Sequence, residues 1–119
     1  MRLLHLAQTA TVEVTSYGSK AAGYAAIARL SGQAVVGVVR LNEHGQLGRH
    51  EAAAPQIAVV LAGSGQSSGA DGEVVKVGPG DAIVWDSGEE HETKCDTPMV
   101  LLILETEAVS LVKDPDDAA

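Results

Sequence analysis

Aromatic and sulfur-containing residues are scarce in this chain of 119 residues. There is no phenylalanine, and the aromatic residues are Trp85, Tyr17 and Tyr24. A core must therefore be packed mainly from Val, Leu, Ile and Ala, and the hydrophobic content of 45% is sufficient for one. The single cysteine, Cys95, excludes an intramolecular disulfide and favours a reducing compartment, so we expect a cytoplasmic protein.

Basic residues are also few. Eight Lys and Arg against sixteen Asp and Glu give a formal net charge of −8, and a field of that sign repels phosphate backbones and anionic lipid. No apolar run approaches the roughly 20 residues of a membrane span, and the opening MRLLHLAQTA is too short and too polar for a signal peptide. We therefore expect neither a nucleic-acid nor a membrane partner.

Short strand-like runs dominate what is present. They alternate apolar and polar residues or are rich in β-branched residues, and many end in turn sequences such as NEHGQLG, VGPGD and DSGEEH. Evenly spaced short strands between Gly-rich turns predict an all-β antiparallel sandwich or barrel in one domain. The expected strands cover residues 11–16, 25–30, 33–41, 56–63, 72–77, 81–85, 91–95 and 99–107.

Residues 19–30 have an alternative assignment. Their sequence, SKAAGYAAIARL, has the composition of a helix, whereas Gly23 and the β-like end of the segment favour extended structure, so both assignments remain open. The acidic end, residues 113–119, lies beyond the apolar pattern, and we expect it to fray.

The first of two histidine segments follows the turn at residues 42–48. His50 is followed by Ala52, Gln56 and Gly63 at intervals of two, four and seven residues. Because side chains alternate faces along an extended chain, positions 50 and 52 share one face, and the turn at Pro55 can return Gln56 to it.

The second segment, GPGDAIVWDSGEEHETKC, is spaced as regularly. Gly80 is followed six residues later by Asp86, and Gly88, His91 and Cys95 come next at intervals of two, three and four residues. A Gly-rich turn thus leads directly into a strand that carries His91.

At these residues the sequence resembles the cupin superfamily, whose two motifs read G-x5-H-x-H-x3–4-E-x6-G and G-x5-P-x-G-x2-H-x3-N. The second motif matches in spacing throughout, with Asp86 in place of Pro and Cys95 in place of Asn. The resemblance covers about residues 33–107. It implies a single cupin domain, residues 1–119, folded as a double-stranded β-helix or jelly-roll barrel around a pocket.

The first motif departs from the family pattern. His50 and Gly63 match, but Gln56 stands where Glu belongs. Ala52 stands where the second His belongs, and the alignment places it in the pocket without a donor atom. In the family, three His and one Glu hold a divalent metal. Only two of these four positions carry His in this chain, at His50 and His91.

The resemblance nevertheless implies a candidate metal site at His50, Gln56 and His91. Imidazole ligands suit transition metals, and the candidate ions are Zn, Ni, Fe and Mn. Gln56 offers only a neutral amide oxygen, which leaves the charge of a cation uncompensated. Two alternatives stay open: a divalent metal site of reduced affinity, and a pocket that has lost its metal and keeps two hydrogen-bonded histidines.

Further side chains are expected along the pocket. Alternation turns Thr93 and Cys95 to the same side as His91, where the thiol is a soft ligand, a reactive group or simply a packed small side chain. Trp85 precedes the turn and is expected either at the pocket mouth or in the core. His44 is either at the pocket rim or a plain loop residue.

Nearby carboxylates are not obvious replacements for the missing Glu. Glu51 and Glu92 each neighbour a candidate ligand histidine, so alternation turns them outward. Glu89 and Glu90 lie in the turn before His91, where we expect solvated side chains.

Two functions of different kinds follow. The one we favour is a binding module whose apolar barrel holds a compact small molecule, with or without a divalent metal. The alternative is a metal-dependent cupin enzyme of the dioxygenase or isomerase type, and isomerase or lyase chemistry would need only a Lewis acid or a histidine base. We also expect a homodimer, because residues 11–16 and 33–39 offer apolar surface that a lone small barrel would leave exposed.

Overall fold

The fold is given by a computed structural model in which residues 1–113 are described. Apart from Lys113, the acidic end that we expect to fray lies outside these residues. Extended structure dominates, because short β-branched runs favour strands and Gly-rich turns separate them. The elements are β1 Arg2–His5, η1 Leu6–Gln8, β2 Val12–Glu13, η2 Ser16–Gly18, β3 Gly23–Tyr24, β4 Ala28–Leu41, β5 Gln46–Glu51, β6 Gln56–Ala62, β7 Gly65–Ser68, β8 Val74–Val77, β9 Asp81–Trp85, β10 Glu90–Cys95 and β11 Met99–Leu111, where η marks a single 3-10 turn.

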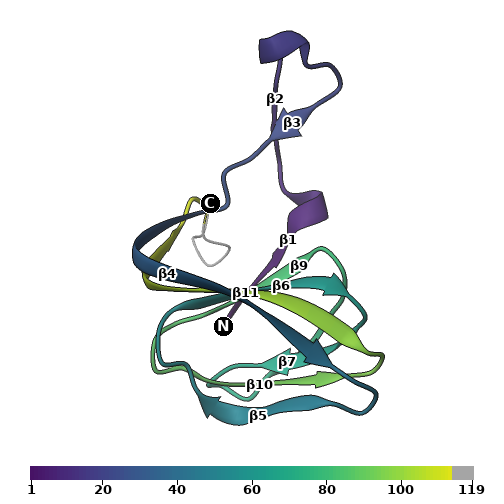
Figure 1. Cartoon of the computed structure of the whole chain (residues 1–119), viewed down its shortest axis with the longest axis vertical. Coiled ribbons are helices and arrows are strands. Elements are labelled where there is room, and N and C mark those ends of the chain that lie inside the picture. The colour runs from purple at the N-terminus through teal and green to yellow at the C-terminus, as the bar shows by residue number, and fades with distance from the viewer. Residues whose placement is uncertain (114–119) are drawn as a thin grey trace.

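Two antiparallel sheets form the body of the molecule (Figure 1). The five-stranded sheet has the order β1-β9-β6-β11-β4, the four-stranded sheet has the order β5-β10-β7-β8, and β2 and β3 form a separate hairpin. Most neighbours in each sheet are distant in sequence, as expected when a chain winds back and forth between the two sheets of a jelly roll. The all-β jelly-roll fold predicted from the sequence is confirmed.

Alternation along the strands divides the apolar residues between two clusters. In β9, Ile83 and Trp85 belong to the cluster between the sheets, whereas Ala82 and Val84 pack on the outer face of the five-stranded sheet. The inner cluster is completed by the buried residues Leu41, Ala58, Val60, Val77, Met99 and Leu101. A sheet that is apolar on both faces needs a cover on its outer side, and η1 together with the ends of β4 and β11 supplies part of it.

Most of the expected strands are present, with some changes. Residues 25–30 and 33–41 contribute to one long strand, β4, and the run at 11–16 shortens to the two-residue β2. The helix alternative for residues 19–30 is wrong, because this segment holds β3 and the beginning of β4. No helix in the part of the chain that the structure describes is long and apolar enough to cross a membrane.

β7 and the first half of β5, residues 46–48, lie where the sequence predicts turns. β7 begins with a glycine because the neighbouring strand leaves no space for a side chain there. A Cβ at Gly65 would lie 2.1 Å from the carbonyl oxygen of Lys94. Two residues further on, Ser67 is buried and its hydroxyl hydrogen-bonds the Thr93 hydroxyl at 2.8 Å. Close backbone approach, rather than hydrophobicity, thus determines the residues of β7.

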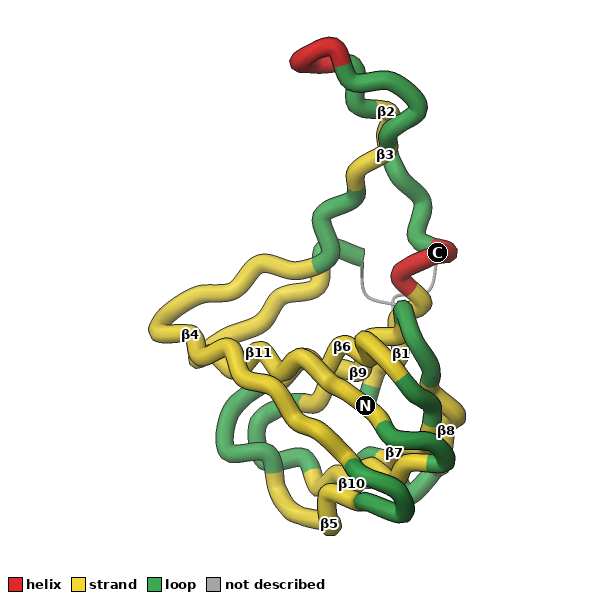
Figure 2. The backbone as a smooth tube through the Cα atoms, turned by 45° about the vertical axis from the view of Figure 1, so that its right-hand side comes forward, coloured by secondary structure: helices red, strands yellow, loops and turns green. Residues whose placement is uncertain are grey.

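Two parts of the chain project from the barrel (Figures 1 and 2). Residues 9–27, which we call the arm, run out from η1 through the β2–β3 hairpin and back into β4. The arm lies along the longest dimension of the molecule, which measures 46 × 30 × 29 Å. The second projection is the antiparallel ribbon formed by the first half of β4 and the second half of β11, which bends at an irregularity between Thr106 and Ala108.

Candidate functional site

A small cavity of about 180 Å³ opens into the barrel between the two sheets. Six strands, β4, β5, β6, β9, β10 and β11, contribute its walls. The walls are mostly apolar, and the polar lining residues are two histidines, one amide–carboxylate pair and Thr93. The lining residues are Val39, Leu47, His50, Gln56, Ala58, Trp85, His91, Thr93, Leu101, Ile103 and Glu105.

The two histidines lie side by side because β5 and β10 pair with His50 opposite His91. Their ring centroids are 4.4 Å apart, with the planes tilted by 54°. The ring of Trp85, on β9, stacks on the ring of His91, with the two ring centroids 4.3 Å apart. His50 is exposed whereas His91 is only 2% exposed, so the row of three rings leads from the surface into the barrel.

Backbone carbonyls hold both imidazoles in one tautomer. Nδ1 of His50 lies 2.7 Å from the carbonyl oxygen of Gly48, and Nδ1 of His91 lies 3.1 Å from that of Glu89. Because a carbonyl oxygen can only accept, each Nδ1 carries the proton and donates it. The neutral form of each ring therefore has its lone pair on Nε2, where it is available to a ligand.

Burial lowers the pKa of His91 below its ordinary value of 6.5, and the neighbouring His50 lowers it further. The hydrogen bond to the Glu89 carbonyl and the Glu89 carboxylate act in the opposite direction but do not outweigh these effects. At neutral pH His91 is thus an uncharged base in a largely apolar wall.

A carboxylate that the motifs do not predict lies at the cavity. Glu105 on β11 is directly opposite Gln56 on β6, and Nε2 of Gln56 donates to Oε1 of Glu105 at 2.7 Å. The amide of Gln56 is therefore engaged as a donor to a carboxylate, and its role differs from that of the family Glu whose place it takes. Strand alternation offered the signal, since Leu101, Ile103 and Glu105 share one face of an otherwise apolar run.

Trp85 acts in the cavity wall as an apolar surface. The ring is 2% exposed, and its Nε1 is the one buried side-chain nitrogen or oxygen without a hydrogen-bond partner among residues 1–113. An unsatisfied buried donor of this kind costs about 1–3 kcal/mol, which the stacking on His91 and the packing in the inner cluster offset in part.

Three residues expected along the pocket are not among its lining residues. His44 lies in the β4–β5 turn, where its ring is 90% exposed beside Glu43. The thiol of Cys95 donates to the carbonyl oxygen of Asn42 at 3.1 Å, and the side chain packs against the inner cluster. Ala52 is buried beside the turn that precedes β10, which its backbone meets through hydrogen bonds with Gly88 and Glu89. Trp85 and Thr93 do line the cavity, and Trp85 also belongs to the inner cluster.

Glu89 corrects a second expectation, because its side chain is buried rather than solvated. Burial would raise its pKa, but hydrogen bonds from the amino group of Met1 and from the backbone N–H groups of Asp86 and Ala70 outweigh that effect. The pKa of Glu89 is therefore lowered from its ordinary value of 4.5. The carboxylate fixes the turn before His91 and takes no part in the cavity lining.

The donor set does not fit a closed metal centre. Transition-metal sites in proteins use three or four protein ligands, and residues 1–113 contain no group of three or more His, Cys, Asp and Glu placed to hold one ion. Gln56 adds only an amide oxygen, and Ala52 adds no donor. One feature does suit a metal. Histidines that bind a metal through one ring nitrogen commonly donate a hydrogen bond from the N–H of the other to a carbonyl oxygen, as Nδ1 of His50 and of His91 does.

Two antiparallel sheets that enclose a cavity with a pair of histidines define a small barrel of the double-stranded β-helix class. The cupin-domain family model matches residues 37–105, more than half of the chain. The chain belongs to the cupin family. No curated protein matches it.

Solved structures share the fold at low sequence identity. A conserved protein of unknown function from Streptococcus pyogenes superposes with a TM-score of 0.59 at 20% identity, over 69% of this chain and 74% of that one. A predicted oxalate decarboxylase from Thermotoga maritima gives 0.56 at 23% identity, over 62% of this chain and 66% of that one. The DMSP lyase DddQ from Ruegeria pomeroyi gives 0.59 at 25% identity, over 73% of this chain but only 47% of the lyase. The chain therefore spans about half the length of the lyase and just under two thirds of the Thermotoga protein.

Proposed function

We propose that the barrel binds a compact small molecule in the cavity between its sheets, with Nε2 of His91 as the hydrogen-bond or proton acceptor. The observation that carries this proposal is a buried, neutral imidazole held in one tautomer at the wall of a largely apolar cavity. Convergent polar groups in an apolar recess are the usual signature of a small-ligand site.

The cavity volume limits the ligand. About 180 Å³ is the share of liquid volume that roughly six water molecules occupy, which suits a molecule smaller than a nucleotide or a typical drug. The apolar walls contribute affinity by excluding water, and two polar poles fix orientation. One pole is the histidine pair at β5 and β10, and the other is the Gln56–Glu105 pair, whose carboxylate favours a ligand that donates a hydrogen bond.

A second candidate function is proton abstraction by His91 in an enzyme of the isomerase or lyase type. The lowered pKa of His91 keeps the ring unprotonated at neutral pH, as a general base requires. A solved structure similar to this chain is a DMSP lyase, which makes lyase chemistry a reasonable class to test. The dioxygenase type has less support, because non-haem iron oxygenases use two His and one carboxylate as ligands and the described residues form no such group.

A divalent ion, Zn, Ni, Fe or Mn, remains a prediction from the family resemblance. His50 and His91 would hold it through Nε2, and the ion would supply Lewis acidity beside the ligand. Elemental analysis of protein purified without added metal or chelator measures its occupancy directly.

The single tryptophan makes ligand binding directly measurable, because Trp85 lies in the cavity wall. We would titrate a panel of compact hydroxy acids, keto acids and phenols while recording tryptophan fluorescence. We expect a saturable change for one class, at least tenfold weaker binding in His91→Ala, and unchanged binding in the matched His44→Ala control. Absence of any saturable response across the panel, or equal loss in both variants, would refute the proposal.

A second measurement, on the class of compounds that binds, distinguishes a binding module from an enzyme. Proton NMR in D₂O of any ligand that binds reports whether a carbon-bound proton exchanges or a bond breaks. Exchange that is lost in His91→Gln, a variant that keeps a hydrogen-bonding side chain but no base, supports the enzyme. Unchanged ligand over prolonged incubation supports the binding module.

A further inference from the structure

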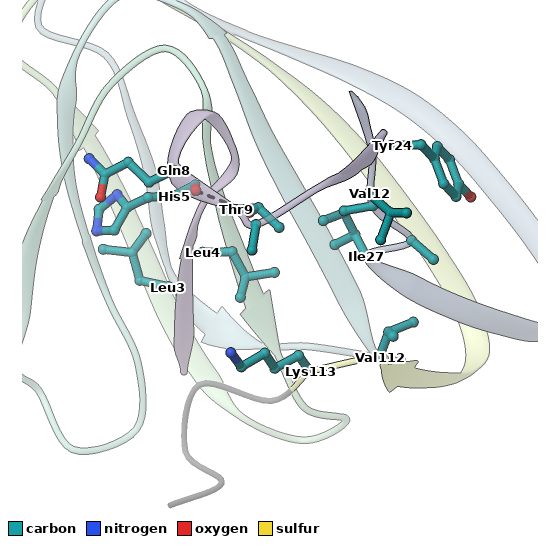
Figure 3. Close-up of a pocket in the computed structure, with 13 residues that line it drawn as sticks. Leu3, Leu4, His5, Gln8, Thr9, Val12, Tyr24, Ile27, Val112 and Lys113 are labelled. Atoms are coloured by element: carbon teal, nitrogen blue, oxygen red, sulfur yellow. Dashed lines mark hydrogen bonds between the residues drawn. The ribbon is translucent and has the colours of Figure 1, made fainter. Parts of the chain in front are cut away.

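Two hollows of the molecule differ in charge. An open groove of about 780 Å³ lies between the arm and the barrel, and Figure 3 shows His5 and Lys113 among its lining residues. Within residues 1–113 no carboxylate lines this groove. The barrel cavity has the opposite character, because the same residues supply one carboxylate, Glu105, and neither Lys nor Arg to its walls. Counting histidine as neutral, the lining of the cavity has a formal charge of −1.

No cation in the described part of the chain neutralises Glu105. The salt bridges among residues 1–113 do not include it. The amide of Gln56 donates to Oε1, but an amide carries no charge. A carboxylate has two oxygens, and Oε2 of Glu105 has no hydrogen-bond partner within these residues. The negative charge at this pole of the cavity is therefore uncompensated.

Two cations close to the histidine pole, Arg49 and the amino group of Met1, are each paired with a carboxylate. Nε of Arg49 lies 3.4 Å from Oε2 of Glu90, and the amino nitrogen of Met1 lies 2.6 Å from Oε2 of Glu89. Neither cation lines the cavity. A ligand carboxylate in the cavity would therefore meet the charge of Glu105 with no unpaired cation to offset it.

Hydrogen-bond acceptors outnumber donors at both poles. Nε2 of each neutral histidine accepts, because Nδ1 already donates to a backbone carbonyl, and the carboxylate of Glu105 only accepts. The hydroxyl of Thr93 is engaged with that of Ser67 at 2.8 Å. Among the lining side chains this leaves the second N–H of the Gln56 amide as a donor. A ligand that satisfies such a lining must donate a hydrogen bond at each end.

We infer that Glu105 determines the charge of the ligand, so that the cavity takes an uncharged compact molecule with a hydroxyl group at each end and rejects carboxylates. This inference rests on the proposed function and names the class of ligand for the same cavity. One hydroxyl donates to Nε2 of His91 and the other donates to Glu105. Phenols, unlike hydroxy acids and keto acids, carry no carboxylate, so the saturable response is expected with them.

The preference against both charges has a physical basis. Two like charges about 6 Å apart, at the effective dielectric constant near a protein surface, repel enough to weaken binding about a hundredfold. An ammonium group would be attracted by Glu105, but moving a charge from water into a largely apolar cavity carries a desolvation penalty that a single ion pair does not recover. An uncharged hydroxyl avoids both costs.

Isothermal titration with three compounds of nearly the same shape tests the charge selectivity. 4-Hydroxybenzyl alcohol, 4-hydroxybenzoate and 4-hydroxybenzylamine differ only in the group opposite the phenol hydroxyl, which is uncharged, negative and positive in turn. We expect the alcohol to bind most tightly, and about a hundredfold more tightly than the benzoate. Glu105→Gln keeps the shape of the side chain but removes its charge, so the benzoate should bind at least tenfold more tightly to this variant. The matched control is Glu107→Gln, which makes the same change in net charge on an exposed side chain of β11 and should change no affinity.

His91→Ala separates binding in the cavity from binding in the groove near His5, since only the former should be lost. His91-dependent binding of the benzoate as tight as that of the alcohol would overturn the inference and leave the proposed function standing. So would tightest binding of the amine, or equal effects of Glu105→Gln and Glu107→Gln in variants that keep the native circular dichroism. If none of the three compounds binds at millimolar concentration the inference fails, and the proposed function fails with it when the hydroxy acids and keto acids give no response either.

Discussion

The Gln56–Glu105 pair allows a quantitative prediction. Replacing the side-chain amide of Gln56 with a carboxylate turns an attractive contact with Glu105 into a repulsive one. Gln56→Glu restores the residue typical of the family motif but replaces the donated hydrogen bond of 2.7 Å with two facing carboxylates. A hydrogen bond to a charged group contributes about 1.5–3 kcal/mol. Two carboxylates at that distance cannot both stay ionised, so one must hold a proton.

The cost follows from the pH. Keeping a proton on a glutamic acid whose ordinary pKa is about 4.3 costs about 3.7 kcal/mol at pH 7 and about 1 kcal/mol at pH 5. Both side chains are part-buried rather than fully enclosed, so solvent screening reduces the expected loss at pH 7 to about 2 kcal/mol. The variant should therefore be about 2 kcal/mol less stable than the wild type at pH 7 and nearly as stable at pH 5.

Urea unfolding followed by Trp85 fluorescence at both pH values measures these differences. Glu105→Gln keeps an amide pair that can still hydrogen-bond, and should cost less than about 1 kcal/mol. The exchange variant, Gln56→Glu with Glu105→Gln, recreates the pair in reverse and should recover most of the loss. A Gln56→Glu protein within 0.5 kcal/mol of the wild type at pH 7, or an exchange variant no better than the single one, would show that the two side chains do not interact.

Other predictions concern pH and packing. Because the folded-state pKa of His91 is lowered from 6.5, the free energy of unfolding should decline as the pH falls below 6.5, and His91→Gln should flatten that part of the stability–pH curve. The pKa of Glu89 is lowered from 4.5, so its contribution is present above that pH and lost below it; Glu89→Gln should therefore destabilise at pH 7 but little at pH 3, by urea unfolding. Gly65→Ala places a Cβ against the Lys94 carbonyl and should cost about 2 kcal/mol or more, while Gly48→Ala, where the added Cβ meets nothing, should leave the thermal midpoint nearly unchanged.

Sequence patterns predict the barrel well, because most of its strands are apolar and alternate. They predict β9 and β10 to within a residue, whereas the pairing of β5 with β10 that brings His50 beside His91 is seen only in the structure. They fail at β7, where close backbone contact demands Gly and Ser and the hydrophobic signal disappears. The pattern of apolar and polar residues carries no information about how closely two backbones approach.

The candidate site was predicted in part. His50, Gln56, His91, Trp85 and Thr93 line the cavity, since their positions follow from strand alternation and motif spacing. Comparison with a motif examines one position at a time, and at position 56 it shows that the expected carboxylate is missing. It could not show that a neighbouring strand supplies another carboxylate to the same cavity, because that depends on the register between β6 and β11.

The order of strands in the five-stranded sheet has a consequence for how the chain folds during synthesis. β1 is made first, yet it pairs with β9, in a register that sets Arg2 opposite Val84. Ribosomes add roughly 5–20 residues per second, so β1 waits several seconds for its partner, far longer than a hairpin takes to form. Sheet closure is therefore a late, long-range event, and we expect slow folding for a protein of this size. Until β9 emerges, the apolar face of β1 is open to chaperones.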